Sequence, residues 1–149
     1  MRRILLPPVM LALCLIGIVA VNYYGIAESV LFTGPEKNAG YLMIFLGIFL
    51  PVWGAHLFRR HKTNIMPYND PDNIVTTGPF GFSRNPMYLG MLLVLLGVAV
   101  LYGTALGFIF ALAYFCVANW YHIPYEEERM LAAFKDEFIA YKARVRRWI

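Results

Sequence analysis

The chain has 149 residues, of which 60% are hydrophobic, and its mean hydropathy is +0.57. Only 15% of the residues are charged, and a soluble domain of this size has too small an interior to bury so much apolar surface. These values exclude an ordinary soluble protein and predict a single domain, residues 1–149, with a lipid bilayer as its main solvent. The net charge of +4 does not indicate nucleic-acid binding, because the basic residues flank apolar runs, as they do beside anionic lipid headgroups.

The first apolar run covers about residues 4–23 and is preceded by Arg2 and Arg3. A cleaved signal peptide is the alternative interpretation, but no clear small-residue cleavage site follows this run, and three more apolar runs come after it. The second run covers about residues 40–58 and ends in the basic sequence RRHK at 59–62. Both runs have the length of a transmembrane helix, which needs roughly 17–25 residues.

The third and fourth apolar runs cover about residues 86–102 and 104–122, with the sequence Tyr-Gly-Thr where they meet. So short a connection allows only a tight turn, and we therefore expect the two runs to form a hairpin of antiparallel helices. The predicted fold class is an all-α membrane protein with about four transmembrane helices and a C-terminal amphipathic helix.

The positive charges predict the orientation of the chain. The N-terminal arginines, the 59–62 cluster, Arg84 and the basic C-terminus all fall on one side of a four-span protein, and cytoplasmic loops are the ones rich in Lys and Arg. We therefore expect an integral membrane protein, of a bacterial inner membrane, with both termini in the cytoplasm. A polar loop at 59–85 and a charged tail at 124–149 then face the cytoplasm, where chemistry in water is possible.

The stretch GPFGFSRNPMYLG leads into the third run. Pro86 suits the first position of a helix, and Asn85 is then a natural N-cap whose side chain accepts from the first-turn amides. This capping does not explain Arg84, a cation at the positive end of a helix, which favours a shared anion. Tyr88 offers a ring with a polar tip, and Gly90 indicates either close approach of a ligand or close packing of helices. We predict a ligand site at this helix N-terminus.

The charged tail is predicted to form an amphipathic helix that lies on the membrane surface, with basic residues beside Trp148. Acidic residues favour the first turn of a helix, and this explanation accounts best for Glu126. At helical spacing Glu127 falls in the centre of the apolar stripe, between Glu126 and Glu128 at its borders. An unpaired carboxylate there is costly, so we expect Glu127 to have a partner such as Arg84 or a ligand. The stripe comprises Met130, Leu131, Phe134, Phe138, Tyr141, Val145 and Trp148.

No metal site is expected from the sequence. Cys14 and Cys116 lie inside apolar runs, and we interpret them as small buried hydrophobic residues, neither disulfide-bonded nor metal-bound. His56, His61 and His122 lie near the ends of apolar runs without the spacing of metal ligands, and we interpret them as interfacial residues.

Together the two motifs resemble the integral-membrane methyltransferases that include isoprenylcysteine carboxyl methyltransferase and the phospholipid N-methyltransferases. In that family an Arg-His/Asn-Pro-x-Tyr-x-Gly motif opens a helix, and a Glu-Glu pair followed by leucine, phenylalanine and tyrosine supplies the second half. The likeness covers about residues 56–149 and includes the loop sequence TNIMP at 63–67. The matching residues are Arg84, Asn85, Pro86, Tyr88 and Gly90, then Glu127, Glu128, Leu131, Phe134 and Tyr141.

The resemblance implies S-adenosylmethionine as methyl donor and a lipophilic or prenylated acceptor reached from the surrounding membrane lipids. Isoprenylcysteine carboxyl O-methylation is the first expectation and phosphatidylethanolamine N-methylation the second. Arg84 and Glu127 are implied as catalytic, Arg84 by orienting a carboxylate and Glu127 as a base where the acceptor is an amine. The residues implied in cofactor binding are Asn85, Pro86, Tyr88, Leu89, Gly90, Glu127, Glu128 and Tyr141.

Three features depart from the family pattern. Asn85 replaces a common histidine, Lys135 stands where a glycine follows Phe134, and the tail lacks the proline often found near its end. Asparagine caps a helix but cannot carry a proton near neutral pH. A hypothesis of another class is a non-catalytic membrane protein that binds a small anion or a lipid headgroup. A transporter is disfavoured, because no charged residue lies at mid-depth of a span.

Overall fold

The computed structural model describes residues 6–26, 31, 33–61 and 73–149. Within these residues the chain forms helices and no strand, which confirms the all-helical prediction for this part of the protein. The TNIMP sequence at 63–67 lies outside the described residues. The elements are α1 (Pro7–Tyr23), α2 (Lys37–Arg60), the 3-10 turn η1 (Gly78–Gly81), α3 (Pro86–Tyr102), α4 (Ala105–Val117), the π-helical turn η2 (Ala118–His122) and α5 (Ile123–Arg144).

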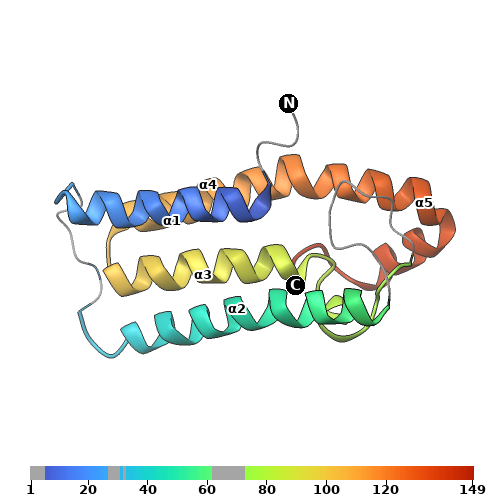
Figure 1. The fold of residues 1–149 in the computed structure, drawn as a ribbon, viewed down its shortest axis with the longest axis horizontal. Coiled ribbons are helices and arrows are strands. Elements are labelled where there is room, and N and C mark those ends of the chain that lie inside the picture. The colour runs from blue at the N-terminus through green and yellow to red at the C-terminus, as the bar shows by residue number, and fades with distance from the viewer. Residues whose placement is uncertain (1–5, 27–30, 32, 62–72) are drawn as a thin grey trace.

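Helix α3 is the centre of the bundle. It contacts α1, α2 and α4, and these helices lie along the long axis of the molecule in Figure 1. The main core joins α1, α3 and the chain from α4 to α5, with Ile18, Leu95 and Ile123 fully buried. The N-terminal end of α3, where the sequence motif lies, is thereby held beside the start of α5.

The bounds of the hairpin follow from its sequence. Helix α3 covers the predicted residues 86–102, because Pro86 begins it and Gly103, at φ 72°, ends it in the left-handed conformation. Thr104 then leads directly into α4, so the predicted hairpin of antiparallel helices is confirmed.

The first two helices differ slightly from the predicted spans. Helix α2 is longer than the predicted 40–58, and α1 begins at Pro7, with residues 4–5 of that span outside the described part.

Helices α2 and α3 approach each other along facing glycines. A Cβ atom on Gly47 would lie 2.7 Å from the Gly90 carbonyl oxygen, and a Cβ atom on Gly97 would lie 2.6 Å from the Gly40 carbonyl oxygen. Small residues let helix backbones meet this closely, as is typical of helix packing in membranes. We call these four residues the glycine seam.

The second half of the hairpin continues beyond the predicted 104–122 run. Helix α4 passes through η2 into α5 without a break, so Pro124 lies near the start of a helix and does not terminate the preceding one. Helix α5 then bends at Lys135 (φ 42°, ψ −113°) and ends at Arg144. The expected helix over 124–149 is therefore present in part, because α5 begins at Ile123, bends at Lys135 and ends before the last five residues.

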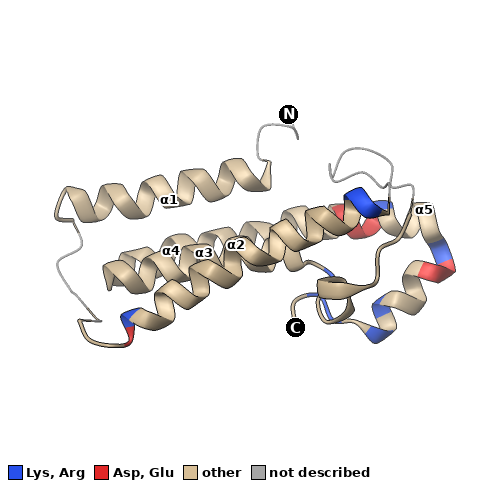
Figure 2. Ribbon diagram, turned by 60° about the horizontal axis from the view of Figure 1, so that its bottom comes forward, with Lys and Arg blue, Asp and Glu red and all other residues tan. Residues whose placement is uncertain are grey.

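The outer surface agrees with a lipid environment. Two helices, Lys37–Arg60 and the continuous Ala105–Arg144, are long and apolar enough to cross a membrane, and Pro7–Tyr23 and Pro86–Tyr102 are shorter apolar helices. Large apolar side chains are exposed around the bundle, with Ile16 64% exposed. Apart from Glu36 and Lys37, the described charged residues gather at the end of the bundle that carries α5 (Figure 2). The number of spans and the orientation of the termini stay predictions.

Candidate functional site at the start of α3

The N-terminus of α3 is built differently from the predicted cap. Asn85 occupies the N-cap position and its carbonyl accepts from the Leu89 amide at 3.0 Å, but its side chain makes no capping bond. Instead Asn85 Nδ2 donates to the Arg147 carbonyl at 3.0 Å, and Ser83 Oγ accepts from the Asn85 amide at 3.1 Å. The capping prediction was wrong because the C-terminal segment offers the Asn85 side chain a long-range partner.

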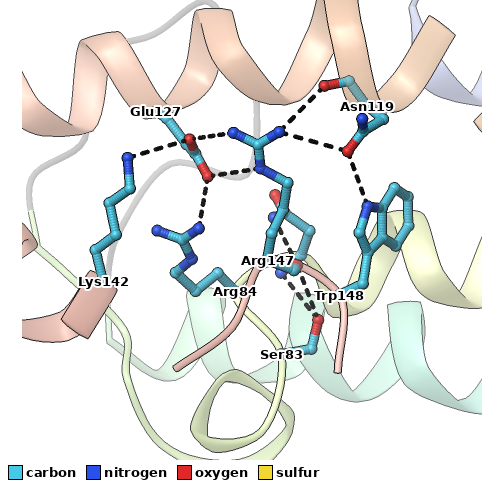
Figure 3. A network of polar contacts seen from close by, with 8 residues as sticks. Ser83, Arg84, Asn119, Glu127, Lys142, Arg147 and Trp148 are labelled. Carbon is cyan, nitrogen blue, oxygen red and sulfur yellow. Dashed lines mark hydrogen bonds and ion pairs between the residues drawn. The ribbon is translucent and has the colours of Figure 1, made fainter. Parts of the chain in front are cut away.

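Glu127 is the centre of the polar network in Figure 3. Its Oε1 atom lies 3.0 Å from Arg84 Nη2 and accepts from Arg147 Nε at 3.2 Å. Its Oε2 atom lies 2.8 Å from Arg147 Nη2 and 3.7 Å from Lys142 Nζ. The predicted pairing of Glu127 with Arg84 is therefore present, and two further cations, Lys142 and Arg147, share the same carboxylate.

The C-terminal segment, residues 145–149, closes over the start of α3. The Arg84 amide donates to the Arg146 carbonyl at 3.0 Å. A backbone hydrogen bond therefore joins the C-terminal segment to the residues before α3, in addition to the side-chain contacts. Trp148 Nε1 donates to Asn119 Oδ1 at 3.0 Å, and the Trp148 ring lies 5.1 Å from that of Phe115. Trp148 is thus half-buried against the protein, and its predicted position at a membrane surface stays a prediction.

Arg84 is buried, and not all of its hydrogen-bond donors have an acceptor among the described residues. Its side chain is 8% exposed, and only Nη2 reaches a carboxylate. Among the described residues, Nε and Nη1 of Arg84 have no hydrogen-bond partner. Buried donors of a charged group are costly when left unpaired, so these two atoms indicate a place for an anion beside Glu127.

Glu126 lies in a different environment from Glu127. The Tyr88 hydroxyl donates to Glu126 Oε1 at 2.5 Å, and the Tyr88 ring lies 6.2 Å from that of His122. Glu126 lies in the first turn of α5, directly after the apolar run that ends at His122. Burial raises the pKa of the Glu126 carboxyl to about 7, against smaller opposing effects of the Tyr88 hydrogen bond and the Arg129 charge. Two adjacent glutamates therefore lie in different surroundings, Glu127 among cations and Glu126 beside a tyrosine hydroxyl.

The other predicted site residues are placed less favourably for a ligand. Gly90 faces α2, since a Cβ atom there would lie 2.4 Å from Pro51 Cδ, so close helix packing accounts for this glycine. Glu128 is exposed and stands outside the network. The Tyr141 hydroxyl donates to the Phe80 carbonyl at 2.7 Å. Pro86 and Leu89 are buried near the start of α3.

Three contributors to the site were missed in the sequence. Arg147 and Asn119 join the network through contacts between distant parts of the chain, for which one sequence carries no signal. Glu126 was assigned to the helix terminus alone, because the predicted helix phase placed it at the border of the stripe. The nearby Tyr88 was the available signal, since a buried tyrosine hydroxyl needs a partner.

Within the described residues, no group of three or more His, Cys, Asp or Glu side chains is arranged to hold a metal ion. The charged side chains that meet at this end are a carboxylate and three cations, a set suited to an organic ligand with its own charges.

The chain is similar to known proteins. A protein of Haemophilus influenzae, described only as an uncharacterized protein, is 36% identical over 63 residues, which are 42% of this chain and 100% of the relative. The family model described as phospholipid methyltransferase matches residues 36–137, more than half of the chain. This match includes the motif at the start of α3 and the three glutamates of α5, and it confirms the family resemblance drawn from them. The chain therefore belongs to the phospholipid methyltransferase family.

Proposed function

We propose that the protein is an S-adenosylmethionine-dependent methyltransferase that acts on a lipophilic acceptor in the membrane. The family supports methyl transfer in general, and the apolar outer surface supports an acceptor that arrives from the bilayer. The observation that carries the proposal is Arg84, which is buried beside Glu127 and has two nitrogen atoms without a partner among the described residues.

The residues present fit the charged groups of this donor. S-adenosylmethionine, when bound, supplies a methyl group on a sulfonium sulfur. Arg84 Nε and Nη1 would hold its methionyl carboxylate, which would satisfy both unpaired donors. Asn85 and Tyr88 line the same end of α3 and would complete the binding surface.

Glu127 can bind a cationic group of the donor only if that group replaces one of the cations that already contact it. Both of its oxygens already accept from cations, and the most exposed of these is Lys142, whose side chain is 53% exposed at 3.7 Å. An ammonium group of the donor would take the position of Lys142 more readily than that of Arg147, which is held by two atoms. Glu127 would then hold the ammonium group of the donor, while Arg84 and Arg147 keep the Glu127 carboxylate in place.

Two acceptors are consistent with the proposal. The resemblance of the sequence motifs favours the carboxylate of an isoprenylcysteine as the methyl acceptor. The family description favours the amine of a phospholipid headgroup such as phosphatidylethanolamine. In either case the protein contributes mainly by alignment of the two substrates and exclusion of water from the buried site.

Equilibrium binding of labelled S-adenosylmethionine to the purified protein tests the proposal. Arg84→Ala and Glu127→Gln are expected to weaken binding by about 30-fold or more, because each removes a charge-assisted contact worth roughly 2 kcal/mol. Incubation of the protein with labelled donor, total membrane lipids and a prenylcysteine then identifies the methylated product.

The matched control is Arg59→Ala, which removes an exposed arginine of α2 at the same end of the bundle. We expect this variant to bind the donor as the wild type does. Equal affinity in Arg84→Ala, Glu127→Gln and wild type would refute the site. No donor binding by the wild type would favour the non-catalytic alternative, a membrane protein that binds an anion or a lipid headgroup.

A further inference from the structure

The neighbouring glutamates of α5 face opposite surroundings. Glu127 is held by Arg84, Arg147 and Lys142. Among the described residues, Glu126 has one hydrogen-bond partner, the Tyr88 hydroxyl, and no cation lies within ion-pair distance of it. Adjacent carboxyl groups with such different environments are typical of sites in which the two carboxyl groups have different roles.

The groups that face Glu126 are mostly neutral. Helix α3 contributes Tyr88, whose ring lies beside that of His122 in η2, and the buried Nε2 of His122 has no partner among the described residues. Helix α4 contributes Tyr114, which is fully buried and donates to the Met91 sulfur at 3.2 Å. The next turn of α5 contributes Arg129, whose charge opposes the effect of burial on this carboxyl. An ionised carboxylate is poorly solvated by these neighbours, so it accepts a proton readily.

We infer that Glu126 is the proton-accepting residue of the site and that Tyr88 is its positioning residue. The inference rests on the proposed function and deepens it, because only an acceptor that carries a proton needs such a group. A lipid amine is the acceptor chemistry that fits, whereas an isoprenylcysteine carboxylate has no proton to lose. Glu127 is less accessible for the same task, because three cations already occupy its two oxygens.

The proton balance assigns one step to Glu126. An ammonium group of the acceptor gives one proton to the Glu126 carboxylate and becomes a neutral amine. The amine nitrogen then forms a bond to the methyl carbon, the carbon–sulfur bond breaks, and its electron pair stays on sulfur. The product is a methylated ammonium and a neutral thioether, and the Glu126 carboxylic acid returns its proton to water before the next turnover.

Infrared spectroscopy of the purified protein tests the proton on Glu126 without any substrate. We expect a protonated-carboxyl band that titrates near neutral pH in the wild type. The band should disappear in Glu126→Gln, shift in frequency in Tyr88→Phe, and persist in Glu127→Gln. A band that persists in Glu126→Gln, or its absence from the wild type at every pH at which the protein is folded, would overturn the inference.

Methyl transfer to a lipid amine supplies the second readout. Glu126→Gln is expected to bind S-adenosylmethionine within about threefold of wild type but to transfer methyl at least about 100-fold more slowly, the usual contribution of a general base. Wild-type transfer rates in Glu126→Gln would overturn the inference and leave the proposed function standing. No donor binding by the wild type would overturn the proposed function, and with it the catalytic role of Glu126, even where the infrared band is present.

Discussion

The glycine seam between α2 and α3 and the polar network at the start of α3 are both buried, yet they are built on opposite principles. Along the seam, Gly47 and Gly90 bring two backbones together and leave no space for a side chain. In the network, Arg84 and Glu127 place full charges inside the protein, and two nitrogens of Arg84 have no partner among the described residues. Close packing explains the seam completely. The network, in contrast, contains hydrogen-bond donors that the described part of the fold leaves without an acceptor.

This difference teaches where a site lies on a bundle of apolar helices. Buried unpaired donors are costly, and a protein that needed only stability would replace them with apolar groups. Their position at the end of α3 that meets α5 supports the ligand site proposed there. Variants of the seam should change folding, and variants of the network should change binding.

The largest expected effect is on the seam. Gly47→Leu would drive a side chain into the Gly90 carbonyl and the Val94 amide, both 2.7 Å from the added Cβ atom. Because backbone cannot yield as a flexible side chain does, we expect a loss of about 3 kcal/mol or more, at the upper end of overpacking. Thermal unfolding in detergent, together with the yield of monodisperse protein, measures it.

The control for the seam is Ile48→Leu, one residue along α2, where the side chain is 56% exposed on the outer surface of the bundle. That variant should unfold at the wild-type temperature. A normally folded Gly47→Leu protein would mean that α2 and α3 are not in close contact, and the contrast between seam and network would fail.

A second, smaller effect distinguishes structural from ligand-binding roles at the border of the network. Tyr141 was predicted to bind the cofactor, but its hydroxyl donates to the Phe80 carbonyl in the buried interior. Tyr141→Phe should therefore lower stability by about 1–2 kcal/mol, the usual cost of a lost buried hydrogen bond, and leave donor affinity within about twofold. Tyr102→Phe, at the exposed end of α3, is the matched control and should change neither quantity.

Reduced donor affinity in Tyr141→Phe with unchanged stability would restore the predicted cofactor role. Burial raises the pKa of Tyr141 to about 12, so its hydroxyl remains a neutral donor over the whole pH range of these measurements.

The parts of the fold that local chemistry determines were predictable. Pro86 and Gly103 set both ends of α3, and the short connection at Gly103 required the hairpin. The pairing of Arg84 with Glu127 was also predicted, because a carboxylate on an apolar stripe needs a cation nearby. These features depend on a few neighbouring residues or on one strong electrostatic requirement.

The rest of the site depends on contacts that no local pattern announces. Arg147 reaches Glu127 because α5 turns back at Lys135 and the C-terminal segment returns to Asn85. The predicted helix over 124–149 contained no such bend and gave no reason for Trp148 to contact Asn119. One signal of the turn was present, since Lys135 stands where the family pattern has glycine.

The smallest expected effect is at that turn. Lys135 adopts φ 42°, a conformation that glycine reaches without the steric cost a side chain meets, and its own side chain is exposed. Lys135→Gly should therefore raise the stability by about 1 kcal/mol, after the greater entropy of glycine in the unfolded chain offsets part of the relieved strain. Lys135→Ala removes the same charge but keeps the Cβ atom, so the unfolding temperature should rise in the glycine variant alone. An equal change in both variants would assign the effect to the lysine charge, and α5 would then need no strained residue to return the C-terminal segment to the network.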